Sequence, residues 1–431
     1  MDNLAVSGVR LRAAEVVGQV LAGRSLTEAL PAALRQLPVK EHAFCKALSF
    51  GTLRWYHRLE FLLRQLCVRP IKDPKIHALA LVGLHQLAFM AVKPHAAVAE
   101  TVAAAKPWAR PLINALLRAY QRQRDALEKA AEADYEASVS HPAWLRQRIE
   151  QAWPRQAAAV LAANLAHPPF AVRVNLARVS RAAYAQRLLA QGLKSQEVAA
   201  VDSALRLDRP VPVEELPGFA QGLVSVQDAA AQLAAPLLAM QPGQRVLDVC
   251  AAPGGKTLHI LESCPELAEV VAVDVSQERL QGVRENLARA GAAGKVRLIC
   301  ADARDPSWWD GRHFERILVD APCTASGVVR RHPDIKLLRR ESDVAALAAR
   351  QREILTAVWP LLARGGRLLY ATCSLLPEEN EAQIRAFLAE HPDARAVPIH
   401  AAWGQVTGWG RQILPGEQDM DGFFYACLEK C

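Results

Sequence analysis

Apolar positions recur at helical spacing throughout the first third of the chain. The longest such stretch runs from Glu41 to Leu66, and Ser25 to Glu28 form a capping box at the start of the helix before it. Further helices are expected at 74–90, 96–106 and 111–123. We therefore expect an all-helical first domain over residues 1–130.

The pattern changes after residue 130. Residues 131–140 are acidic and rich in alanine, which is typical of a linker. A helical segment at 142–166, a short strand at 170–175 and a helix at 181–191 follow. These elements predict a small α/β connecting subdomain over residues 141–225.

Strands and helices alternate regularly from residue 226 to the end of the chain. The strand candidates are Arg245–Cys250, Val270–Val275, Val296–Cys300, Arg316–Asp320 and Arg367–Ala371, and helical stretches such as 276–290 and 343–362 lie between them. This alternation predicts an α/β fold with a Rossmann-like, doubly wound sheet over residues 226–431. Ligands of such sheets bind outside the carboxyl ends of the strands.

Charge is distributed unevenly along the chain. Residues 1–130 contain 19 Lys and Arg against 9 Asp and Glu, whereas the remaining residues contain 33 against 35. A basic helical domain beside a near-neutral one favours a module that binds a polyanion. The candidate phosphate contacts are Arg10, Arg12, Arg54, Arg58, Arg118, Arg122 and Arg124, although each taken alone is more typical of a solvated surface arginine.

Composition excludes several other classes of protein. The nine cysteines are scattered without a Cys-x-x-Cys pair, so neither a disulfide framework nor a zinc site is expected. No apolar run approaches the roughly 18 residues of a membrane span, and charged residues interrupt the first twenty positions. We expect a cytoplasmic protein with no metal and no membrane association, most simply a monomer.

A glycine turn follows the first strand of the predicted sheet. Gly254 and Gly255 would let the backbone approach a ligand closely at a helix start. The turn is not a P-loop, because Cys250 stands where that motif requires glycine, and the dinucleotide fingerprint is also absent. A cofactor without phosphates, such as S-adenosylmethionine (AdoMet), needs neither motif.

Three acids close successive strands of the same sheet. Asp274 stands where an acid can accept from both ribose hydroxyls, and Asp302 could accept from an adenine amino group. Asp320 would lie near the amino-acid end of the cofactor or near the target base. One such acid is often only a helix cap, but three in succession favour a nucleoside site.

Two cysteine-bearing strings also follow apolar strands, Asp320-Ala-Pro-Cys323 and Thr372-Cys373-Ser374. Two thiols beside an AdoMet-type cofactor suit methylation of cytosine C5. A thiolate that adds to C6 makes C5 nucleophilic, and removal of the C5 proton then releases the thiolate. The basic loop Arg330, Arg331, His332 and Lys336 holds an RNA strand in one hypothesis and is merely solvated in the other.

These motifs resemble the RNA cytosine-C5 methyltransferases over about residues 145–431. The strings at 250–257, 320–323 and 371–374, Leu414-Pro-Gly and Asp421 to Ala426 carry the likeness. The first domain resembles the NusB RNA-binding domain in Arg10 to Val20, Phe50 to Trp55, Leu79 to Met90 and Ile113 to Arg118. Together the two parts resemble the methyltransferase B type of bacterial enzymes that act on small-subunit ribosomal RNA.

The resemblance implies a role for each motif. Cys373 would be the nucleophile and Cys323 would assist release of the product, although DNA cytosine methyltransferases use a Pro-Cys nucleophile and so leave Cys323 as the alternative. The partner would be 16S ribosomal RNA and the cofactor AdoMet. The expected cofactor-binding residues are Cys250, Ala251, Ala252, Pro253, Gly254, Gly255, Lys256, Asp274, Arg279, Asp302 and Asp320.

Other functions remain open at this point. A transfer RNA could be the substrate instead, and only the helical domain weighs against it. A NusB-like RNA-binding protein with a vestigial sheet domain would fit the basic helices but not the paired thiols. A Rossmann oxidoreductase is opposed by the missing glycine fingerprint.

Overall fold

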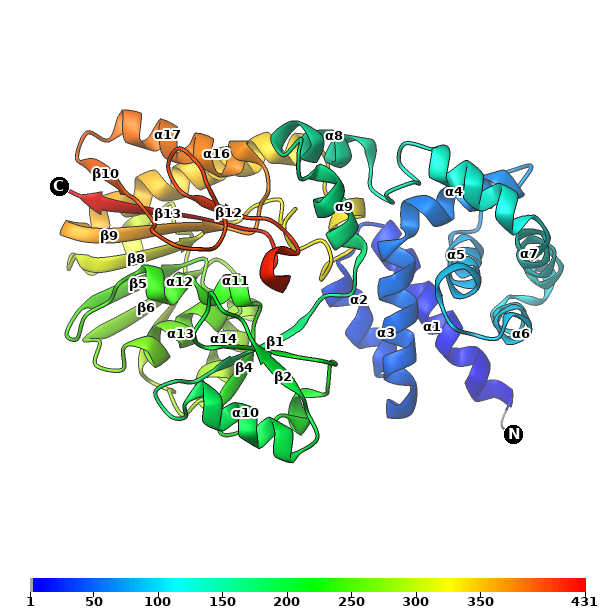
Figure 1. Ribbon diagram of the computed structural model, residues 1–431, viewed down its shortest axis with the longest axis horizontal. Coiled ribbons are helices and arrows are strands. Elements are labelled where there is room, and N and C mark those ends of the chain that lie inside the picture. Colours follow the sequence, from blue (N-terminus) through cyan, green and yellow to red (C-terminus); the bar gives the residue numbers. More distant parts are fainter. Residues whose placement is uncertain (1–2) are drawn as a thin grey trace. The chain divides into compact units, whose positions relative to one another are not determined.

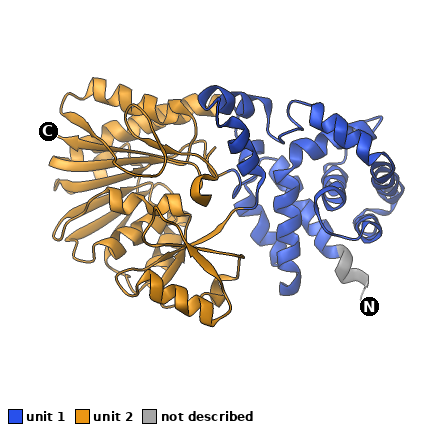
Figure 2. Cartoon of the chain, in the orientation of Figure 1, with its two compact units in different colours: residues 1–167, 329–341 blue, residues 168–328, 342–431 orange. Residues whose placement is uncertain are grey.

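Two compact units make up the chain (Figure 2). The computed structural model describes residues 3–431, with side chains from residue 8, so the first two residues of the predicted helical domain lie outside it. Unit 1 contains the residues up to 167 together with 329–341, and unit 2 contains 168–328 and 342–431. Unit 1 is therefore discontinuous in sequence.

Unit 1 is built from helices packed around one apolar core (Figure 1). They are α1 (Asn3–Leu21), α2 (Leu26–Leu34), α3 (Val39–Arg54), α4 (Tyr56–Leu66), α5 (Pro74–Phe89), α6 (Pro94–Ala104), α7 (Arg110–Ala133), α8 (Ala143–Ala152), α9 (Ala157–Leu165) and the short α15 (Ile335–Leu338). The all-helical prediction is confirmed. The single long helix expected at 41–66 is wrong, because the chain leaves helical geometry at Trp55 and starts a new helix there.

The segment predicted as a linker, residues 131–140, is folded against the helices. Ala131 and Ala137 are fully buried in the core of unit 1. The carboxylate of Asp134 accepts hydrogen bonds from the backbone N–H groups of Glu136 and Ala137, at 3.0 and 2.8 Å. The alanines of this segment therefore pack in the core and Asp134 caps a turn, so the prediction of a linker is wrong.

The piece 329–341 is held in unit 1 by buried polar contacts. The Lys336 ammonium group donates to the backbone carbonyls of Arg54 and Ser140, each at 2.6 Å. Arg54 donates to the carbonyl of Arg330 at 2.9 Å, and the Asp334 carboxylate accepts from the backbone N–H of Leu26 at 3.0 Å. Burial lowers the pKa of Lys336 well below its usual range.

Burial also corrects part of the RNA-contact hypothesis. Lys336 and Arg330 are 2% and 3% exposed, so their predicted contact with an RNA strand is wrong; that of Arg331 and His332 stays a prediction. Three of the candidate phosphate contacts in the helices, Arg10, Arg54 and Arg58, are buried as well.

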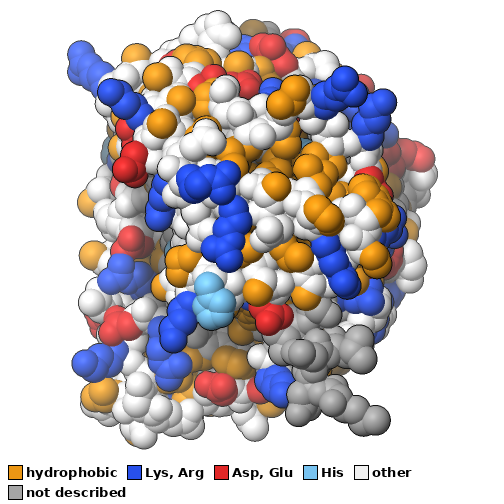
Figure 3. Space-filling model, turned by 90° about the vertical axis from the view of Figure 1, so that its right-hand side faces the viewer, with side chains coloured by type: hydrophobic (Ala, Val, Ile, Leu, Met, Phe, Trp, Pro, Cys, Tyr) orange, Lys and Arg blue, Asp and Glu red, His pale blue; other side chains and the backbone are white. Residues whose placement is uncertain are grey.

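Their guanidinium groups have partners inside unit 1. Arg10 donates to Gln86 at 2.9 Å and Arg58 to Glu128 at 2.6 Å. Arg118, Arg122 and Arg124 of α7 are exposed. Lys and Arg side chains lie among apolar ones on the face of unit 1 that Figure 3 shows.

Unit 2 begins with residues 168–225 of the predicted small α/β part, whereas its first helical segment, up to residue 167, lies in unit 1. The strands β1 (Phe170–Val174), β2 (Ser195–Glu197), β3 (Ala204–Leu207) and β4 (Val224–Val226) form an antiparallel sheet in the order β2-β3-β1-β4. The helix α10 (Arg181–Ala190) buries Tyr184 and Leu188 in a core with Val172 and Leu205.

The larger sheet of unit 2 contains β5 (Arg245–Val249), β6 (Glu269–Asp274), β7 (Val296–Cys300), β8 (Phe314–Asp320), β9 (Leu362–Thr372), β10 (Ala394–Val397), β11 (Gln405–Val406), β12 (Arg411–Ile413) and β13 (Phe423–Lys430). Its order is β11-β12-β13-β9-β8-β5-β6-β7, with β10 beside β13. The pairs from β9 to β7 are parallel and those involving β13 are antiparallel. The Rossmann-like prediction is confirmed.

Helices cover both faces of this sheet (Figure 1). The helices α11 (Ala229–Gln232), α12 (Ala234–Leu237), α13 (Gly255–Ser263) and α14 (Gln277–Arg289) lie on one face, and α16 (Ser342–Val358) and α17 (Glu381–Glu390) on the other. The central strands are mostly apolar because neither of their faces meets water. Among the described helices, none is long and apolar enough to cross a membrane.

Candidate active site

A cavity of about 420 Å³ lies at the carboxyl ends of the parallel strands of unit 2. Eight of the predicted site residues line it: Cys250, Ala252, Asp274, Arg279, Asp302, Asp320, Cys323 and Cys373. The other predicted residues of the glycine turn, Ala251, Pro253, Gly254, Gly255 and Lys256, do not line it. Parallel strands all present their carboxyl ends at one sheet edge, so residues far apart in sequence converge there.

The glycine turn leaves β5 in a sharply bent backbone. Cys250 has φ +61° and the Ala252–Pro253 peptide bond is cis. Gly254 has φ +92°, and a Cβ atom there would lie 2.8 Å from a methyl group of Val283. Only glycine fits this position. The helix α13 begins at the next residue, Gly255, directly after the turn.

Asp274, at the end of β6, is tied to this turn. It is 3% exposed, and its carboxylate accepts from the backbone N–H groups of Ala252 and Ser276 at 3.1 and 3.0 Å. Arg279 lies 3.6 Å from the same carboxylate. Asp274 therefore joins two strand ends and directs negative charge at the cavity.

Asp302 lies in a more open part of the cavity. Its carboxylate accepts from the Arg304 guanidinium at 2.6 Å, and this hydrogen bond lowers the pKa of Asp302 to about 2. Arg304 also lines the cavity, and no motif in the sequence indicated it. The predicted acceptor is thus ionised, with a cation already beside it.

Lys256 and Asp320 form an ion pair with 2.6 Å between nitrogen and oxygen. Burial lowers the pKa of Lys256, but the Asp320 carboxylate and Cys373 raise it, and the net direction is upward. The ammonium also lies 5.2 Å from the centre of the Phe423 ring. A fixed positive charge therefore interacts with both the strand-end acid and one of the thiols.

The two predicted thiols come together at the ends of β8 and β9. The Sγ atoms of Cys323 and Cys373 are 3.5 Å apart. Cys323 is 7% exposed, and the hydrogen bond with Cys373 together with burial raises its pKa well above the usual range. Cys373 is half-buried. The pair is thus asymmetric: one thiol keeps its proton, and the other is the more accessible.

Three buried polar residues near the site were not found from the sequence. Asp248, in β5, accepts from the Thr257 hydroxyl at 2.6 Å, and burial raises its pKa to about 7. Arg173, in β1, donates to the carbonyl of Gly255 at 2.7 Å. Glu379 accepts from groups next to both thiols. The only feature of the sequence that marked these three residues was a charged side chain within or beside an apolar run.

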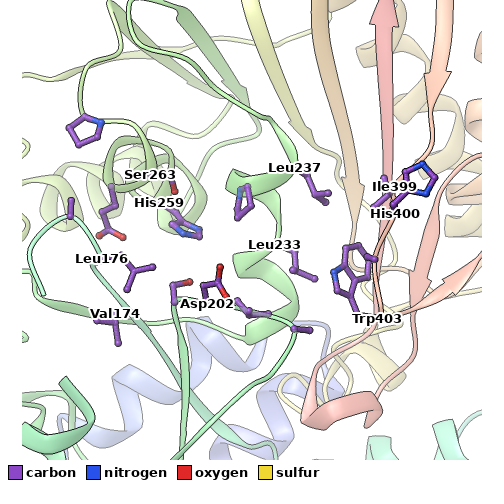
Figure 4. A pocket seen from close by; sticks show the side chains of 18 residues that line it. Val174, Leu176, Asp202, Leu233, Leu237, His259, Ser263, Ile399, His400 and Trp403 are labelled. Atoms are coloured by element: carbon purple, nitrogen blue, oxygen red, sulfur yellow. The ribbon is translucent and has the colours of Figure 1, made fainter. Parts of the chain in front are cut away.

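Unit 2 contains a larger cavity, of about 760 Å³ (Figure 4). Its lining includes Asp202, His259 and Trp403 and none of the predicted site residues. Chemistry rather than size therefore identifies the candidate active site. Within residues 3–431, no group of His, Cys, Asp and Glu is arranged to hold a metal ion.

The residues present fit AdoMet. Ala252 of the turn lines the cavity, Asp274 offers a buried carboxylate, and the cavity wall contains several carboxylates that suit a cationic sulfonium. The thiols open into the same cavity, so a methyl donor bound there would face them.

Comparison with known proteins covers almost the whole chain. Family models described as NusB family, RsmF/B-like ferredoxin-like domain and 16S rRNA methyltransferase RsmB/F match residues 7–122, 141–214 and 235–429. Ribosomal RNA small subunit methyltransferase B of Vibrio cholerae is 48% identical over 99% of this chain and 98% of its own. The protein of that name from Pseudomonas syringae is 48% identical, over 98% and 96%.

Solved structures share the fold. The crystal structure of PH0851 has a TM-score of 0.82 at 24% identity and covers 99% of both chains. A methyltransferase homologue from Pyrococcus horikoshii has a TM-score of 0.59 at 29% identity, over 66% of this chain and 94% of its own.

Proposed function

This chain belongs to the 16S rRNA methyltransferase RsmB/F family, and from that membership we propose that it methylates C5 of a cytosine in small-subunit ribosomal RNA. The choice of C5 as the methylated atom rests on one observation: the sulfur atoms of two thiols lie 3.5 Å apart in the candidate cofactor cavity. Cytosine C5 needs a thiol adduct at C6 before it can attack a methyl group, whereas ring nitrogens and ribose hydroxyls do not.

Cys373 is the proposed nucleophile. Its thiolate adds to C6 of the flipped cytosine, and the C5–C6 π electrons then form the new bond from C5 to the methyl group, whose bond to the donor sulfur would break and leave its electron pair on that sulfur. A base removes the C5 proton, the C5–H electrons restore the double bond, and the thiolate leaves. The greater exposure of Cys373 supports this role, because an incoming base must reach its sulfur.

Cys323 is proposed to assist release of the product. Its raised pKa keeps a proton on the sulfur that lies beside the Cys373 sulfur. A thiol in that place can hydrogen-bond to Cys373 as the latter departs with its electron pair. The reverse assignment, with Cys323 as nucleophile, would require the more buried thiol to lose its proton.

AdoMet would be held by the residues predicted for it, namely Cys250 to Lys256, Asp274, Arg279, Asp302 and Asp320. Bound there, it supplies the electrophilic methyl group. Asp274 offers its carboxylate to the ribose hydroxyls and Asp302 to the adenine amino group. Lys256 holds Asp320 in place, where it can accept from the exocyclic amine of the target base.

The remaining predictions complete the proposal. The chain acts as a cytoplasmic monomer on 16S ribosomal RNA, with functional domains at 1–130, 141–225 and 226–431. The exposed arginines of α7, Arg118, Arg122 and Arg124, contact RNA phosphates.

The test combines product mapping with adduct trapping. The wild type, Cys373→Ala and Cys323→Ala are incubated with labelled AdoMet and unmodified 16S ribosomal RNA. We expect 5-methylcytosine from the wild type only, no adduct from Cys373→Ala, and a protein–RNA adduct that accumulates with Cys323→Ala. Labelling of transfer RNA alone would overturn the substrate, and no transfer to any RNA would favour a non-catalytic RNA-binding protein.

A further inference from the structure

We propose that Glu379 is a positioning residue for the reaction: its one buried carboxylate fixes both catalytic thiols relative to each other. Glu379 is fully buried and lies in the turn before α17. Neither cysteine string contains it, and no part of the proposed function assigns it a role. The inference rests on the proposed function and names a further part of the same site.

One half of the carboxylate's contacts fixes the Cys323 turn. Thr324, the next residue, donates to Glu379 twice, from its backbone N–H at 2.8 Å and from its hydroxyl at 2.6 Å. The Gln351 amide donates both to Glu379, at 3.1 Å, and to the carbonyl of Pro322, at 2.9 Å. Cys323 is thus held on both sides by groups that end on one carboxylate.

The remaining hydrogen bond to the carboxylate fixes the turn that contains Cys373. The hydroxyl of Ser374, the next residue, donates to the carboxylate oxygen that also accepts from the Thr324 hydroxyl. Asn380 donates to the Ser374 carbonyl at 2.9 Å. Because a single oxygen accepts from both turns, the carboxylate fixes the position of one turn relative to the other.

Glu379 is itself held in place. Tyr370 in β9 donates its hydroxyl to the Glu379 carbonyl at 2.7 Å. The four donors to the carboxylate are neutral groups among the residues that the structure describes. Burial raises the pKa of Glu379, and the hydrogen bonds from these donors oppose that rise. The donors therefore favour the ionised carboxylate, which is an acceptor only.

Glu379 has an electrostatic role as well. Its negative charge contributes to the raised pKa of Cys323, after the hydrogen bond with Cys373 and burial. The carboxylate therefore sets the distance between the thiols and also favours the protonated form of Cys323. A residue that only filled the core would do neither.

Glu379→Gln tests the proposal, because the glutamine amide presents N–H groups to donors. Asp393→Asn is the matched control: it makes the same change in a carboxylate of unit 2 that accepts from Trp359, outside the candidate site. We expect kcat of Glu379→Gln to fall about 100-fold, with KM for RNA and Kd for AdoMet changed less than threefold. Equal kcat for the two variants would overturn the proposal.

A second measurement needs neither RNA nor AdoMet, so it separates this proposal from the proposed function. Cys323 alkylation by iodoacetamide, mapped by mass spectrometry across pH, should begin at lower pH in Glu379→Gln than in the wild type. An unchanged profile would show that Glu379 has no charge effect on Cys323.

Two further variants keep the carboxylate and remove one hydroxyl each, together with its hydrogen bond to Glu379. Thr324→Val removes the hydroxyl of the Cys323 turn, and Ser374→Ala that of the Cys373 turn. Each should lower kcat by less than Glu379→Gln does, and neither should lower it much further when combined with Glu379→Gln. Independent, multiplicative losses would overturn the shared positioning role. Thr324→Val, Ser374→Ala and their double variant apply the same test without Glu379→Gln, so the proposal stays testable if Glu379→Gln fails to fold.

Discussion

Cys323 Sγ lies 3.5 Å from Cys373 Sγ, although fifty residues separate the two along the chain. Each sulfur follows a parallel strand, β8 or β9, and these strands are neighbours in the sheet. The pairing of two strands therefore brings the thiols together, and the turns that follow set how closely they approach.

The short distance predicts a specific oxidative cross-link. Diamide takes one hydrogen from each of two thiols and is itself reduced to a hydrazine, so it should join Cys323 to Cys373 and abolish methylation. Dithiothreitol should restore the activity. Non-reducing peptide mapping identifies the bond, and the exposed Cys300 serves as the internal control. A main product that links Cys373 to Cys300 would contradict the geometry.

Asp248 predicts a pH dependence of stability. Burial raises its pKa to about 7, above that of the unfolded chain, so folding binds a proton. The resulting stabilisation is complete below about pH 4 and is lost as the pH rises through about 7. Asp248→Asn should therefore be more stable than the wild type at pH 8, by at most about 4 kcal/mol.

Urea unfolding of both proteins at pH 5 and pH 8 measures this difference. The asparagine can still accept from Thr257, so the local hydrogen bond remains. The same difference at both pH values would show that Asp248 is ionised throughout.

Arg173, in the small α/β part of unit 2, holds the glycine turn by a hydrogen bond. It is fully buried and donates to Glu262 at 2.8 Å as well as to Gly255. Arg173→Met should cost about 3–5 kcal/mol of stability, because it leaves Glu262 as an unpaired buried charge. AdoMet binding should also weaken as the turn loosens.

A double variant checks the cause of that loss. Arg173→Met with Glu262→Gln should recover part of the stability in a denaturant titration, because the stranded charge is gone. If the two single losses simply add, Glu262 is not the reason for the cost.

Lys336 predicts that unit 1 depends on a residue far along the chain. Lys336→Met should remove the donors to the carbonyls of Arg54 and Ser140, at roughly 1–3 kcal/mol for each unpaired group. Hydrogen exchange should rise in peptides around both residues and stay unchanged in β5 to β9. Lys129→Met, at an exposed position of α7, is the control. Equal exchange in the two variants would argue against this anchoring.

The sequence predicted the sheet and the meeting of its functional residues because both follow from local order. An apolar run marks a buried strand, and its last residue marks the carboxyl edge. Cys323, Cys373 and Asp274 could thus be assigned to one edge without knowledge of any contact. The helical domain was likewise found from its period.

Other features depend on contacts that no local pattern reveals. Arg330 and Lys336 belong to a basic string that looks solvated, yet both are buried because their partners lie near residues 54 and 140. The contacts of Glu379 join residues at 324, 351 and 374, so its role is visible only after folding. Trp55 ends a helix without glycine or proline to signal the break.

The split of unit 1 has a consequence for synthesis of the chain. Residues 168–328, about 160 in number, must be translated before 329–341 emerges. At about 5–20 residues per second, that takes roughly 8–30 s. During this time the carbonyls of Arg54 and Ser140 lack the hydrogen-bond donor that Lys336 later provides. The helices made first are therefore completed only after the strand leading to Cys323 has left the ribosome, so the two units cannot mature in simple N-to-C order.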